Sequence, residues 1–519
     1  MKKLIMILIV LALAAGAGAT THWYCDNSAA GGANGTSWIN AYESFATITW
    51  GASGVKAGDT LDLSGGTTSQ TYNEGLTIGA SGTAGNTILV RTGQDAGHNG
   101  VVTINGGNYV RSLGIYLNGK SYVKVSGKVG TNKNIKVYNF ADAGVDFEGT
   151  ATNLEFEYLE VDSNGNSSDR HGFVGVLQYN SNYVSSIHDC YIHDNYQDGI
   201  NIVQSSNGEA SQFGSFLIYN NRIANICDDG MEFAIGADVY NNEIGPRISC
   251  GGIGHPDGFQ FYNSYTKIYN NYIHGLVLTS DPGNSNSSIF FDPFDASITL
   301  NPKYVYIYNN LMVETQTPGT GDVHRGIAVK FAETGVLSAD HIYVCNNTLV
   351  GIPFLGLTLT FASLGTAAVS DIVYENNIFE NIGVSGAAIA AVETGNGTIT
   401  YGSHGSGADV IFDYNDYYRS SVSYSNQVAV DANYYTITQF RAANSTEAHG
   451  IEVDPAFTGA YALSAGSGCI NSAVTQTIFT TDKNSTTRYG AWDMGAYEYG
   501  EASPPATKKC TITLIGRGN

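Results

Sequence analysis

A short motif of alternating apolar residues followed by two asparagines recurs along the middle of the chain. Its clearest copy is Ile218-Tyr219-Asn220-Asn221-Arg222-Ile223, and further copies lie at 239–244, 268–273, 307–310, 344–347 and 374–377. Alternation of apolar and polar positions is typical of a short strand, and the asparagines indicate the turn that ends it. Because asparagine tolerates a left-handed backbone and its amide can bond to a neighbouring turn, the pairs predict ladders of stacked turns.

A second motif recurs in step with the first and consists of a small residue followed by apolar residues at every second position. Examples are Gly199-Ile200-Asn201-Ile202 and Gly230-Met231-Glu232-Phe233, and the small residues stand at 144, 172, 199, 230, 258, 288, 326, 356 and 386. One unit cannot bury its own apolar side chains, whereas stacked units bury them in a shared core. The repeat therefore predicts an all-β protein, a single-stranded right-handed parallel β-helix of roughly 10–13 coils. In this fold the residues one and three places after the small residue point inward, and the residues two and four places after it point outward.

The beginning of the chain has the pattern of an export signal. Met1-Lys2-Lys3 precedes an apolar run from Leu4 to Ala15, and small residues then lead to Ala17-Gly18-Ala19, a pattern typical of a secretory signal peptide over residues 1–19. The run is too short to cross a bilayer, which takes about 20 residues, and no later segment is long and apolar enough. We therefore expect a secreted protein, extracellular or at the cell surface, without a transmembrane segment in its mature chain.

The rest of the chain is expected to form one elongated domain with distinct ends. Residues 20–110 are expected to form an N-terminal cap and the first coils, residues 111–420 the repeats, and residues 421–500 the last coils and a cap. A linker and tail follow at 501–519. The chain has 63 Gly and 34 Tyr but only 10 Pro, a composition of strands and turns, and no sustained amphipathic helical stretch follows the signal.

The charge of the chain restricts its partners. A formal net charge of −22 argues against nucleic acid, whose phosphates require a basic surface. It also disfavours a polyanionic glycan unless a cation lies between the glycan and the protein. Seven cysteines without Cys-x-x-Cys spacing do not indicate a zinc site, and their pairing cannot be read from the sequence.

Segments near both ends of the mature chain resemble a known group of proteins. The segments are Trp23-Tyr24-Cys25-Asp26, Ala57-Gly58-Asp59-Thr60-Leu61, Asp454-Pro455-Ala456-Phe457 and Asp493-Met494-Gly495-Ala496-Tyr497-Glu498. They are similar to segments of bacterial secreted right-handed parallel β-helix repeat proteins of the pectate-lyase-like superfamily, in which the C-terminal segment precedes surface anchors. The resemblance covers nearly the whole mature chain and implies a polysaccharide as the partner and an association with the cell surface. It does not select a chemistry, because the group contains lyases, hydrolases, epimerases and proteins of unknown role.

Stacking brings residues of successive coils into columns with a spacing of about 4.8 Å. The residues that precede the small residues form one column, which contains His171, Asp198, Asp229, Asp257, Ser287 and Arg325. Two outward columns contain Asn201, Glu232 and Gln260, and then Tyr262, Asp292 and Lys330. Three aspartates about 5 Å apart repel one another, which raises a pKa or recruits a cation. The candidate site is therefore expected on the outer face between residues 171 and 330.

One interpretation of these columns is a glycoside hydrolase. Asp229 or Asp228 is then the general acid and Asp257 or Asp198 the base, while His171 or His255 orients or protonates. Neighbours in the column lie near the roughly 5 Å separation of retaining enzymes, and aspartates two coils apart lie about 9.6 Å from each other, at the upper edge of the inverting range. Substrate-binding residues on the same face are expected to be Asn201, Glu232, Gln260, Tyr262, Arg325 and Lys330. The order of residues loosely resembles polygalacturonase-type glycosidases, although the spacing of Arg325 and Lys330 departs from theirs.

A second interpretation is a polysaccharide lyase that uses calcium. The oxygen atoms of Asp198, Asn201, Asp229 and Glu232, with Asp257 beside them, are ligands that suit Ca²⁺. The ion would neutralise a uronate carboxylate, and Arg325 or Lys330 would abstract the proton next to it. No basic residue follows Glu232 closely, which departs from the calcium-dependent lyases that the pattern resembles.

Non-catalytic interpretations stay open beside these two. An aspartate before glycine often closes a turn by bonding to its own backbone, so each Asp-Gly pair also has a structural explanation. The chain would then be a cell-surface or matrix β-helix that binds glycan or cations, and a tailspike-like depolymerase or an epimerase is a further alternative. The concentration of acids, amides and a histidine on one face favours an enzyme, a hydrolase or lyase acting on a glycan laid along the β-helix.

Overall fold

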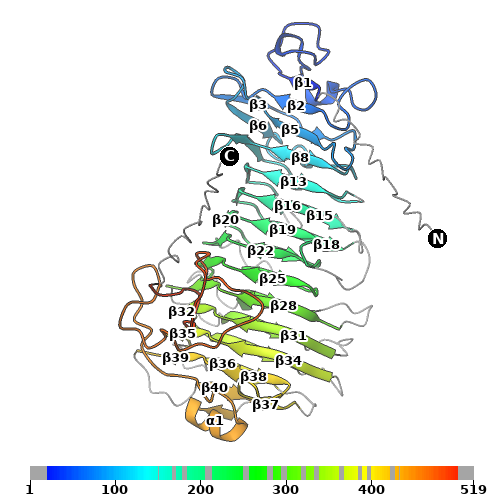
Figure 1. Ribbon diagram of the computed structural model, residues 1–519. Helices are drawn as coiled ribbons and strands as arrows, with labels where there is room; N and C mark the ends of the chain where they lie inside the picture. The colour runs from blue at the N-terminus through cyan, green and yellow to red at the C-terminus, as the bar shows by residue number, and fades with distance from the viewer. Residues whose placement is uncertain are drawn as a thin grey trace, which may run out of the picture.

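The repeats stack into three long sheets that run the length of the molecule (Figure 1). The computed structural model describes residues 20–149, 151–165, 171–177, 184–204, 213–248, 256–277, 285–293, 301–316, 323–331, 338–361, 368–383, 389–393, 399–420, 427–431 and 433–500. The expected signal peptide, the expected tail and His255 lie outside these residues. No helix in the described parts of the chain is long and apolar enough to span a bilayer.

Sheet 1 begins each coil and lies immediately before the asparagine turn. Its 14 strands in the described residues, in hydrogen-bonded order, are β1 (His22–Cys25), β2 (Thr60–Leu63), β5 (Ile88–Thr92), β8 (Val123–Ser126), β13 (Leu154–Glu157), β16 (Ser185–His188), β19 (Phe216–Tyr219), β22 (Asp238–Tyr240), β25 (Thr266–Tyr269), β28 (Lys303–Tyr308), β31 (Ser338–Cys345), β34 (Ala368–Glu375), β38 (Val410–Asp413) and β37 (Tyr401–Gly402).

Sheet 2 follows the asparagine turn in each coil. In the described part of the chain it has 12 strands: β3 (Ser69–Tyr72), β6 (Val101–Asn105), β11 (Ile135–Tyr138), β14 (Leu159–Asp162), β17 (Tyr191–His193), β20 (Arg222–Ala224), β23 (Glu243–Ile244), β26 (Tyr272–His274), β29 (Leu311–Val313), β32 (Thr348–Val350), β35 (Ile378–Glu380) and β39 (Asp416–Tyr418).

Sheet 3 completes each coil and contains the second sequence motif. Its 13 strands among the described residues are β4 (Leu76–Thr77), β7 (Leu113–Tyr116), β12 (Ala143–Asp146), β15 (His171–Leu177), β18 (Ile200–Gln204), β21 (Met231–Phe233), β24 (Phe259–Phe261), β27 (Ser285–Phe291), β30 (Val323–Lys330), β33 (Leu355–Thr360), β36 (Ala390–Glu393), β40 (Val428–Val430) and β41 (Asn433–Tyr435). Neighbouring strands in the three sheets are parallel, except for the antiparallel pair β40 and β41 at the end. The predicted all-β, right-handed parallel β-helix is therefore confirmed.

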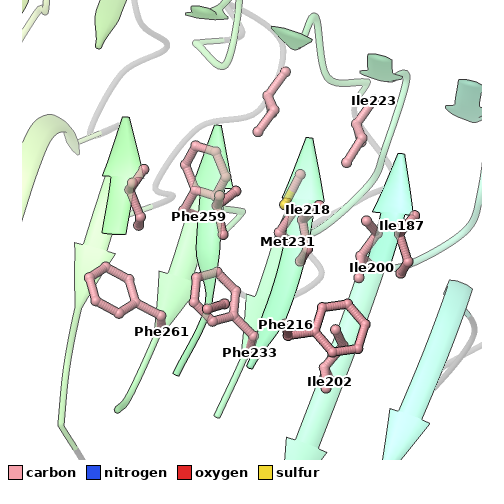
Figure 2. Close-up of a cluster of buried hydrophobic side chains, with 14 of the residues drawn as sticks. Ile187, Ile200, Ile202, Phe216, Ile218, Ile223, Met231, Phe233, Phe259 and Phe261 are labelled. Carbon is pink, nitrogen blue, oxygen red and sulfur yellow. The ribbon is translucent and has the colours of Figure 1, made fainter. Parts of the chain in front are cut away.

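The interior is a stack of apolar side chains in register. On sheet 3, Met231 faces Ile200 on one side and Phe259 on the other, and all three are fully buried. Phe233 and Phe261 form the next inward column, with ring centroids 5.5 Å apart. Figure 2 shows these rings in one cluster with apolar residues of the other two sheets. Burial of each such side chain contributes about 1.5–3 kcal/mol to stability, and the inward positions predicted from the motif are confirmed.

The asparagine turns form the ladder that the first motif predicts. Between Asn221 and Asn415, the second asparagine of each pair donates from its backbone N–H and from its Nδ2. Both groups donate to Oδ1 of the matching asparagine on the next coil, at 3.0–3.1 Å. The ladder ends where Asn415 Nδ2 donates to Glu447 Oε1 at 2.8 Å. The first asparagine of each pair has a positive φ, for example 56° at Asn220 and 64° at Asn376. Both properties expected of these asparagines are confirmed.

One expectation about the register in the last third of the chain is wrong. The motif places Gly386 opposite Gly356, but Leu357 pairs with Ala390, so the matching position is Ile389, three residues later. The stretch from 386 to 391 is Gly-Ala-Ala-Ile-Ala-Ala, and its small residues on both faces leave the period-2 register undefined. The described residues also contain a short helix, α1 (Ile437–Asn444), which begins with a capping box between Thr436 and Gln439 and is compatible with the absence of a sustained helical stretch.

The two ends of the stack are closed by irregular segments. Two 3₁₀ turns, η1 (Trp38–Asn40) and η2 (Phe45–Thr47), lie in the N-terminal part, and a small hairpin of β9 (Lys128–Val129) and β10 (Asn132–Lys133) follows β8. After α1, the C-terminal segment turns back and packs against the side of the stack near β32 and β35 (Figure 1). It thereby covers part of the asparagine turns.

Candidate functional site

Three aspartates of the predicted column form a ladder along the edge of sheet 3. The backbone N–H of Asp229 donates to Asp198 Oδ1 at 3.1 Å, and that of Asp257 donates to Asp229 Oδ1 at 2.7 Å. Asp257 Oδ1 in turn accepts a short bond from the backbone N–H of Ser287. The exposed fractions of the three aspartates are 1%, 4% and 2% in chain order. These carboxylates therefore hold successive coils in register, instead of bonding only to their own turns.

A continuous chain of hydrogen bonds lies beside this ladder on the outer face. Asn201, Glu232 and Gln260 occupy matching positions on β18, β21 and β24. Asn201 Nδ2 donates to Asp198 Oδ2 at 2.9 Å and to Glu232 Oε2 at 2.6 Å. The Tyr262 hydroxyl donates to Glu232 Oε1 at 2.7 Å and accepts from Gln260 Nε2 at 2.6 Å. The outward columns predicted from the repeat are thus aligned as expected, and their side chains contact one another.

Asp198, Asp229 and Glu232 each contribute one carboxylate oxygen to a group in which all oxygens lie within 4.8 Å of one another. We call these three residues the carboxylate cluster. His171 Nδ1 lies 2.9 Å from Asp198 Oδ2, so protonation of this histidine would create a buried ion pair. Several oxygen ligands at such short mutual distances form the donor set that a hard cation such as Ca²⁺ prefers.

Burial and mutual repulsion disfavour negative charge in the carboxylate cluster. Burial raises the pKa of Asp229 well above its ordinary value, and the charges of Asp257, Asp198, Asp228 and Glu232 raise it further. Burial also raises the pKa of Glu232, as does the charge of Asp198, while the hydrogen bond from Tyr262 acts in the opposite direction. Burial and the charge of Glu232 together raise the pKa of Tyr262, which keeps its hydroxyl protonated. A bound divalent cation would offset the repulsion among these acids.

Two other groups of acids and histidine lie on sheets 1 and 2, and they contain their own cations. Glu155 and Glu157 lie near His188, and Lys124 Nζ lies 2.8 Å and 2.9 Å from their carboxylates. The second group consists of Glu160, Asp162 and His193, with Lys136 Nζ 2.6 Å from both carboxylates. The carboxylate cluster also has a histidine beside it, because His171 Nδ1 lies 2.9 Å from Asp198 Oδ2.

Arg325 and Lys330 lie on the same face but apart from the carboxylate cluster. Both belong to β30, three strands beyond β21 in sheet 3, which corresponds to about 14 Å along the stack. Lys330 Nζ lies 3.2 Å from Asp292 Oδ2, and Arg325 Nη1 donates to Ser285 Oγ at 2.8 Å. They can therefore contact a long polymer, but the structure does not bring them to the cluster as proton-abstracting groups.

Two of the predicted acids line one small pocket. Asp228, which is partly exposed, and Asp257, which is buried, line this pocket together with Arg247. An acid pair for hydrolysis that includes Asp257 would use a carboxylate already bonded to the backbone of Ser287. His255, the other predicted histidine, lies outside the described residues.

A buried polar network beneath sheet 3 is missing from the sequence-based expectations. His324 on β30 is fully buried, with Nδ1 2.9 Å from Asn286 Oδ1 and Nε2 3.2 Å from Ser288 Oγ. Glu314 Oε1 lies 3.7 Å from His324 Nε2. Burial lowers the pKa of His324 to about 3, and the charges of Arg247 and Arg325 act in the same direction. The sequence contains one signal for this network: His324 and Asn286 both stand two residues before the small residue of their motif, which places them at matching positions on neighbouring coils.

Comparison with known proteins identifies similar solved structures but no family. No protein-family profile and no curated protein sequence matches the chain. XylC in complex with xylose is similar over 93% of this chain and 99% of its own, with 10% identity and a TM-score of 0.44. Pectate lyase Pel9A is similar over 93% and 98%, with 15% identity and a TM-score of 0.38. The GH136 lacto-N-biosidase from Eubacterium ramulus is similar over 79% and 68%, with 11% identity and a TM-score of 0.39.

Proposed function

We propose that this protein cleaves a uronate-containing polysaccharide by β-elimination on the outer face of sheet 3, with a divalent cation such as Ca²⁺ at the carboxylate cluster. The observation that carries the proposal is the approach of Asp198, Asp229 and Glu232 oxygens to within 4.8 Å of one another. A molecule with a net charge of −22 repels a polyanion, whereas a cation held by its acids attracts the carboxylates of that polymer. Export, which residues 1–19 predict, would place this activity outside the cell.

The donor set of the cluster fits such a cation. Asp198, Asp229 and Glu232 supply carboxylate oxygens, and Asn201 bridges two of them through Nδ2 at 2.9 Å and 2.6 Å. The two ends of an asparagine amide have nearly the same shape, so a half-turn of the side chain presents Oδ1 in place of Nδ2. These four residues would hold the ion, which supplies neutralisation of the substrate carboxylate.

Proton transfer is assigned to Glu232 and Tyr262. Their 2.7 Å hydrogen bond joins a carboxylate that can accept a proton to a hydroxyl that can donate one to the departing sugar oxygen. Gln260 fixes the orientation of the Tyr262 hydroxyl from the other side. Arg325 and Lys330 bind sugar units farther along the polymer, because β30 lies three strands away on the same face.

The test uses purified residues 20–519 and a panel of neutral and uronate-containing polysaccharides, with Ca²⁺ or with a chelator. We expect unsaturated products, read by their ultraviolet absorbance, from a uronate polymer with Ca²⁺ and none with the chelator. New reducing ends without unsaturated products would show that the polymer is cleaved by hydrolysis and not by elimination. Binding without any product would favour the alternative of a non-catalytic cell-surface or matrix protein.

Variants locate the activity on the molecule. Tyr262→Phe removes a proton-transfer group alone, whereas Glu232→Gln removes a group assigned both to proton transfer and to the ion, so turnover should fall by about 10²–10⁴-fold in Tyr262→Phe and at least as much in Glu232→Gln. Glu380→Gln is the matched control, because Glu380 is a half-buried acid on β35 of sheet 2. Equal losses in all three variants would remove the assignment of Glu232 and Tyr262.

A further inference from the structure

A hollow in the surface lies over the asparagine turns between sheets 1 and 2. It has a volume of about 490 Å³, and its lining residues include Lys133, Tyr191, Asn220, Arg222, Asn241 and Glu243. We call this hollow the turn groove. Ligand sites usually have volumes of about 300–1,000 Å³, so the turn groove is large enough for a short oligomer. Each coil passes this turn before it reaches sheet 3, so the turn groove is separate from the carboxylate cluster.

The turn groove exposes two members of a column that is covered on the later coils. Asn220 and Asn241 are the first asparagines of their pairs, and both side chains are exposed. The equivalent residues on later coils are at most 5% exposed, and they are Asn270, Asn309, Asn346 and Asn376. The difference arises because the C-terminal segment lies over the later coils and ends its contacts near Asn270, where Lys483 Nζ donates to the backbone carbonyl at 2.6 Å.

The covered asparagines show what this column can bind. Asn309 Nδ2 donates to the carbonyl of Thr481 at 2.7 Å. Asn376 exchanges two bonds with the backbone of Val474, donating at 2.8 Å and accepting at 3.0 Å. Asn309 Oδ1 also accepts from Arg488 Nη2 at 3.1 Å, so Asn309 and Asn376 each present one donor and one acceptor to the C-terminal segment. Asn220 and Asn241 present the same pair of groups in the turn groove.

The surroundings of the column change between its covered and exposed parts. The covered part packs Phe479, Trp492 and Met494 of the C-terminal segment against Tyr308 and Ile378 in an apolar cluster. The turn groove has charged side chains instead, with Arg222 and Glu243 exposed by 51% and 41%. An apolar polypeptide therefore suits the covered part, whereas a polar and strongly hydrogen-bonding ligand suits the turn groove.

The charges of the turn groove favour an anion. Among the lining residues, Lys133 and Arg222 supply two positive charges and Glu243 one negative charge, in a molecule with a net charge of −22. Asp189, at the matching turn position of the preceding coil, lies 2.8 Å from His188 Nδ1. Arg222 is held in place because its Nε lies 3.4 Å from Glu243 Oε1 and its guanidinium lies over the ring of Tyr191 at 5.2 Å. A guanidinium with free N–H groups binds carboxylates well.

We propose that the turn groove is a non-catalytic binding site for a carboxylated oligosaccharide. Asn220 and Asn241 bond to hydroxyls at intervals of one coil, about 4.8 Å, which is comparable with the length of one sugar unit. Lys133 and Arg222 bind the carboxylates. The inference rests on the proposed function only for the class of polymer. A second site would keep the protein attached to a polymer between cleavage events on sheet 3.

The test measures binding in the presence of a chelator, so that a cation at the carboxylate cluster does not contribute. Oligogalacturonate and oligomannuronate are titrated into the Glu232→Gln protein by calorimetry, with uncharged oligosaccharides and poly-glutamate as comparisons. We expect a uronate oligomer to bind and its affinity to fall at least tenfold in a Lys133→Gln/Arg222→Gln variant. Asn241→Gly should also weaken binding, and glycine tolerates the φ of 56° at this position. Circular dichroism and thermal unfolding check that each variant is folded.

The outcomes separate this site from the proposed reaction. Absence of uronate binding, or unchanged affinity in the double variant, would overturn the assignment of the turn groove. Binding of poly-glutamate with no uronate binding would identify a polypeptide ligand instead. Turnover of a short soluble substrate with Ca²⁺ should persist in the double variant, because Lys133 and Arg222 do not belong to sheet 3. If the unaltered protein does not turn over that substrate, the result contradicts the proposed reaction at the carboxylate cluster and leaves the binding result for the turn groove unchanged.

Discussion

The backbone N–H of Asp257 donates to Asp229 Oδ1 at 2.7 Å, so a candidate reactive carboxylate also joins two neighbouring coils. Asp229 is only 4% exposed, and burial together with its acidic neighbours raises its pKa. The same side chain therefore stabilises the stack through its hydrogen bond and destabilises it through its charge.

Two substitutions separate these effects. Asp229→Asn keeps an oxygen acceptor for Asp257 and removes the negative charge, so its unfolding free energy should equal or exceed that of the unaltered protein. Asp229→Ala leaves the buried N–H of Asp257 without its acceptor, which costs about 1–3 kcal/mol. Denaturant unfolding measures both, and equal destabilisation by the two variants would contradict the dual role.

Calcium should stabilise the protein in the absence of any substrate. A ligand at 100 times its dissociation constant adds about 2.7 kcal/mol to the unfolding free energy if it binds only the folded state. We expect the unfolding temperature to rise with Ca²⁺ and the rise to shrink in Glu232→Gln, with Glu380→Gln behaving like the unaltered protein. An unfolding temperature that ignores Ca²⁺ up to millimolar concentration would argue against a cation at the carboxylate cluster.

Acid should destabilise the protein through His324. Its pKa is lowered to about 3 in the folded chain, whereas an unfolded histidine titrates near 6.5. Between these values the unfolded state binds one more proton than the folded state, so stability falls as pH falls from 6.5 toward 3, by up to about 1.4 kcal/mol per pH unit. Above pH 6.5 this contribution is constant.

The measurement compares unfolding free energies of the unaltered protein and His324→Gln from pH 7.5 to pH 4. Glutamine is polar but does not titrate, so the gap between the two proteins should narrow as the pH falls. A gap that stays constant over this range would show that His324 does not bind a proton on unfolding.

The asparagine ladder should have a measurable stability. Asn271 Nδ2 donates to the carbonyl of Val239 and to Asn310 Oδ1, both at 3.0 Å, while Asn271 Oδ1 accepts two bonds from Asn242. Asn271→Ala leaves several buried groups unpaired, and each such group costs about 1–3 kcal/mol, so we expect a loss of at least about 2 kcal/mol. The exposed Asn73, whose replacement by alanine should change stability by less than about 0.5 kcal/mol, is the control.

Most of the fold follows from periodicity in the sequence. The alternation around Ile200 and Met231 defines which side chains face the interior, and the equal spacing of the repeats aligns Asn201, Glu232 and Gln260. The register fails where both faces carry alanine, as between Gly386 and Ala391, because side-chain size then no longer distinguishes inside from outside. The capping box at Thr436 is a signal for α1 that a search for long amphipathic helices overlooks.

Less of the candidate site than of the fold can be predicted from the spacing of residues in the sequence. Spacing places Asp198, Asp229 and Asp257 in one column, but it does not reveal that their carboxylates accept bonds from the next coil. Nor does it show that Asn201 bridges Asp198 and Glu232, because this depends on side-chain rotation. The turn groove depends on where the C-terminal segment stops, a contact between residues more than 200 positions apart.

The returning C-terminal segment also changes how the molecule should come apart. In a simple solenoid each coil touches only its neighbours, so order is lost by fraying from either end. Here Lys483 is bonded to Asn270 and Val474 to Asn376, contacts that span 213 and 98 residues. The coils between these two points all contact the same C-terminal segment, so they should unfold together in one cooperative transition. In the described structure the coils before Asn270 lack these contacts, so they should unfold one after another from the N-terminal end. The turn groove therefore lies at the border between two modes of unfolding.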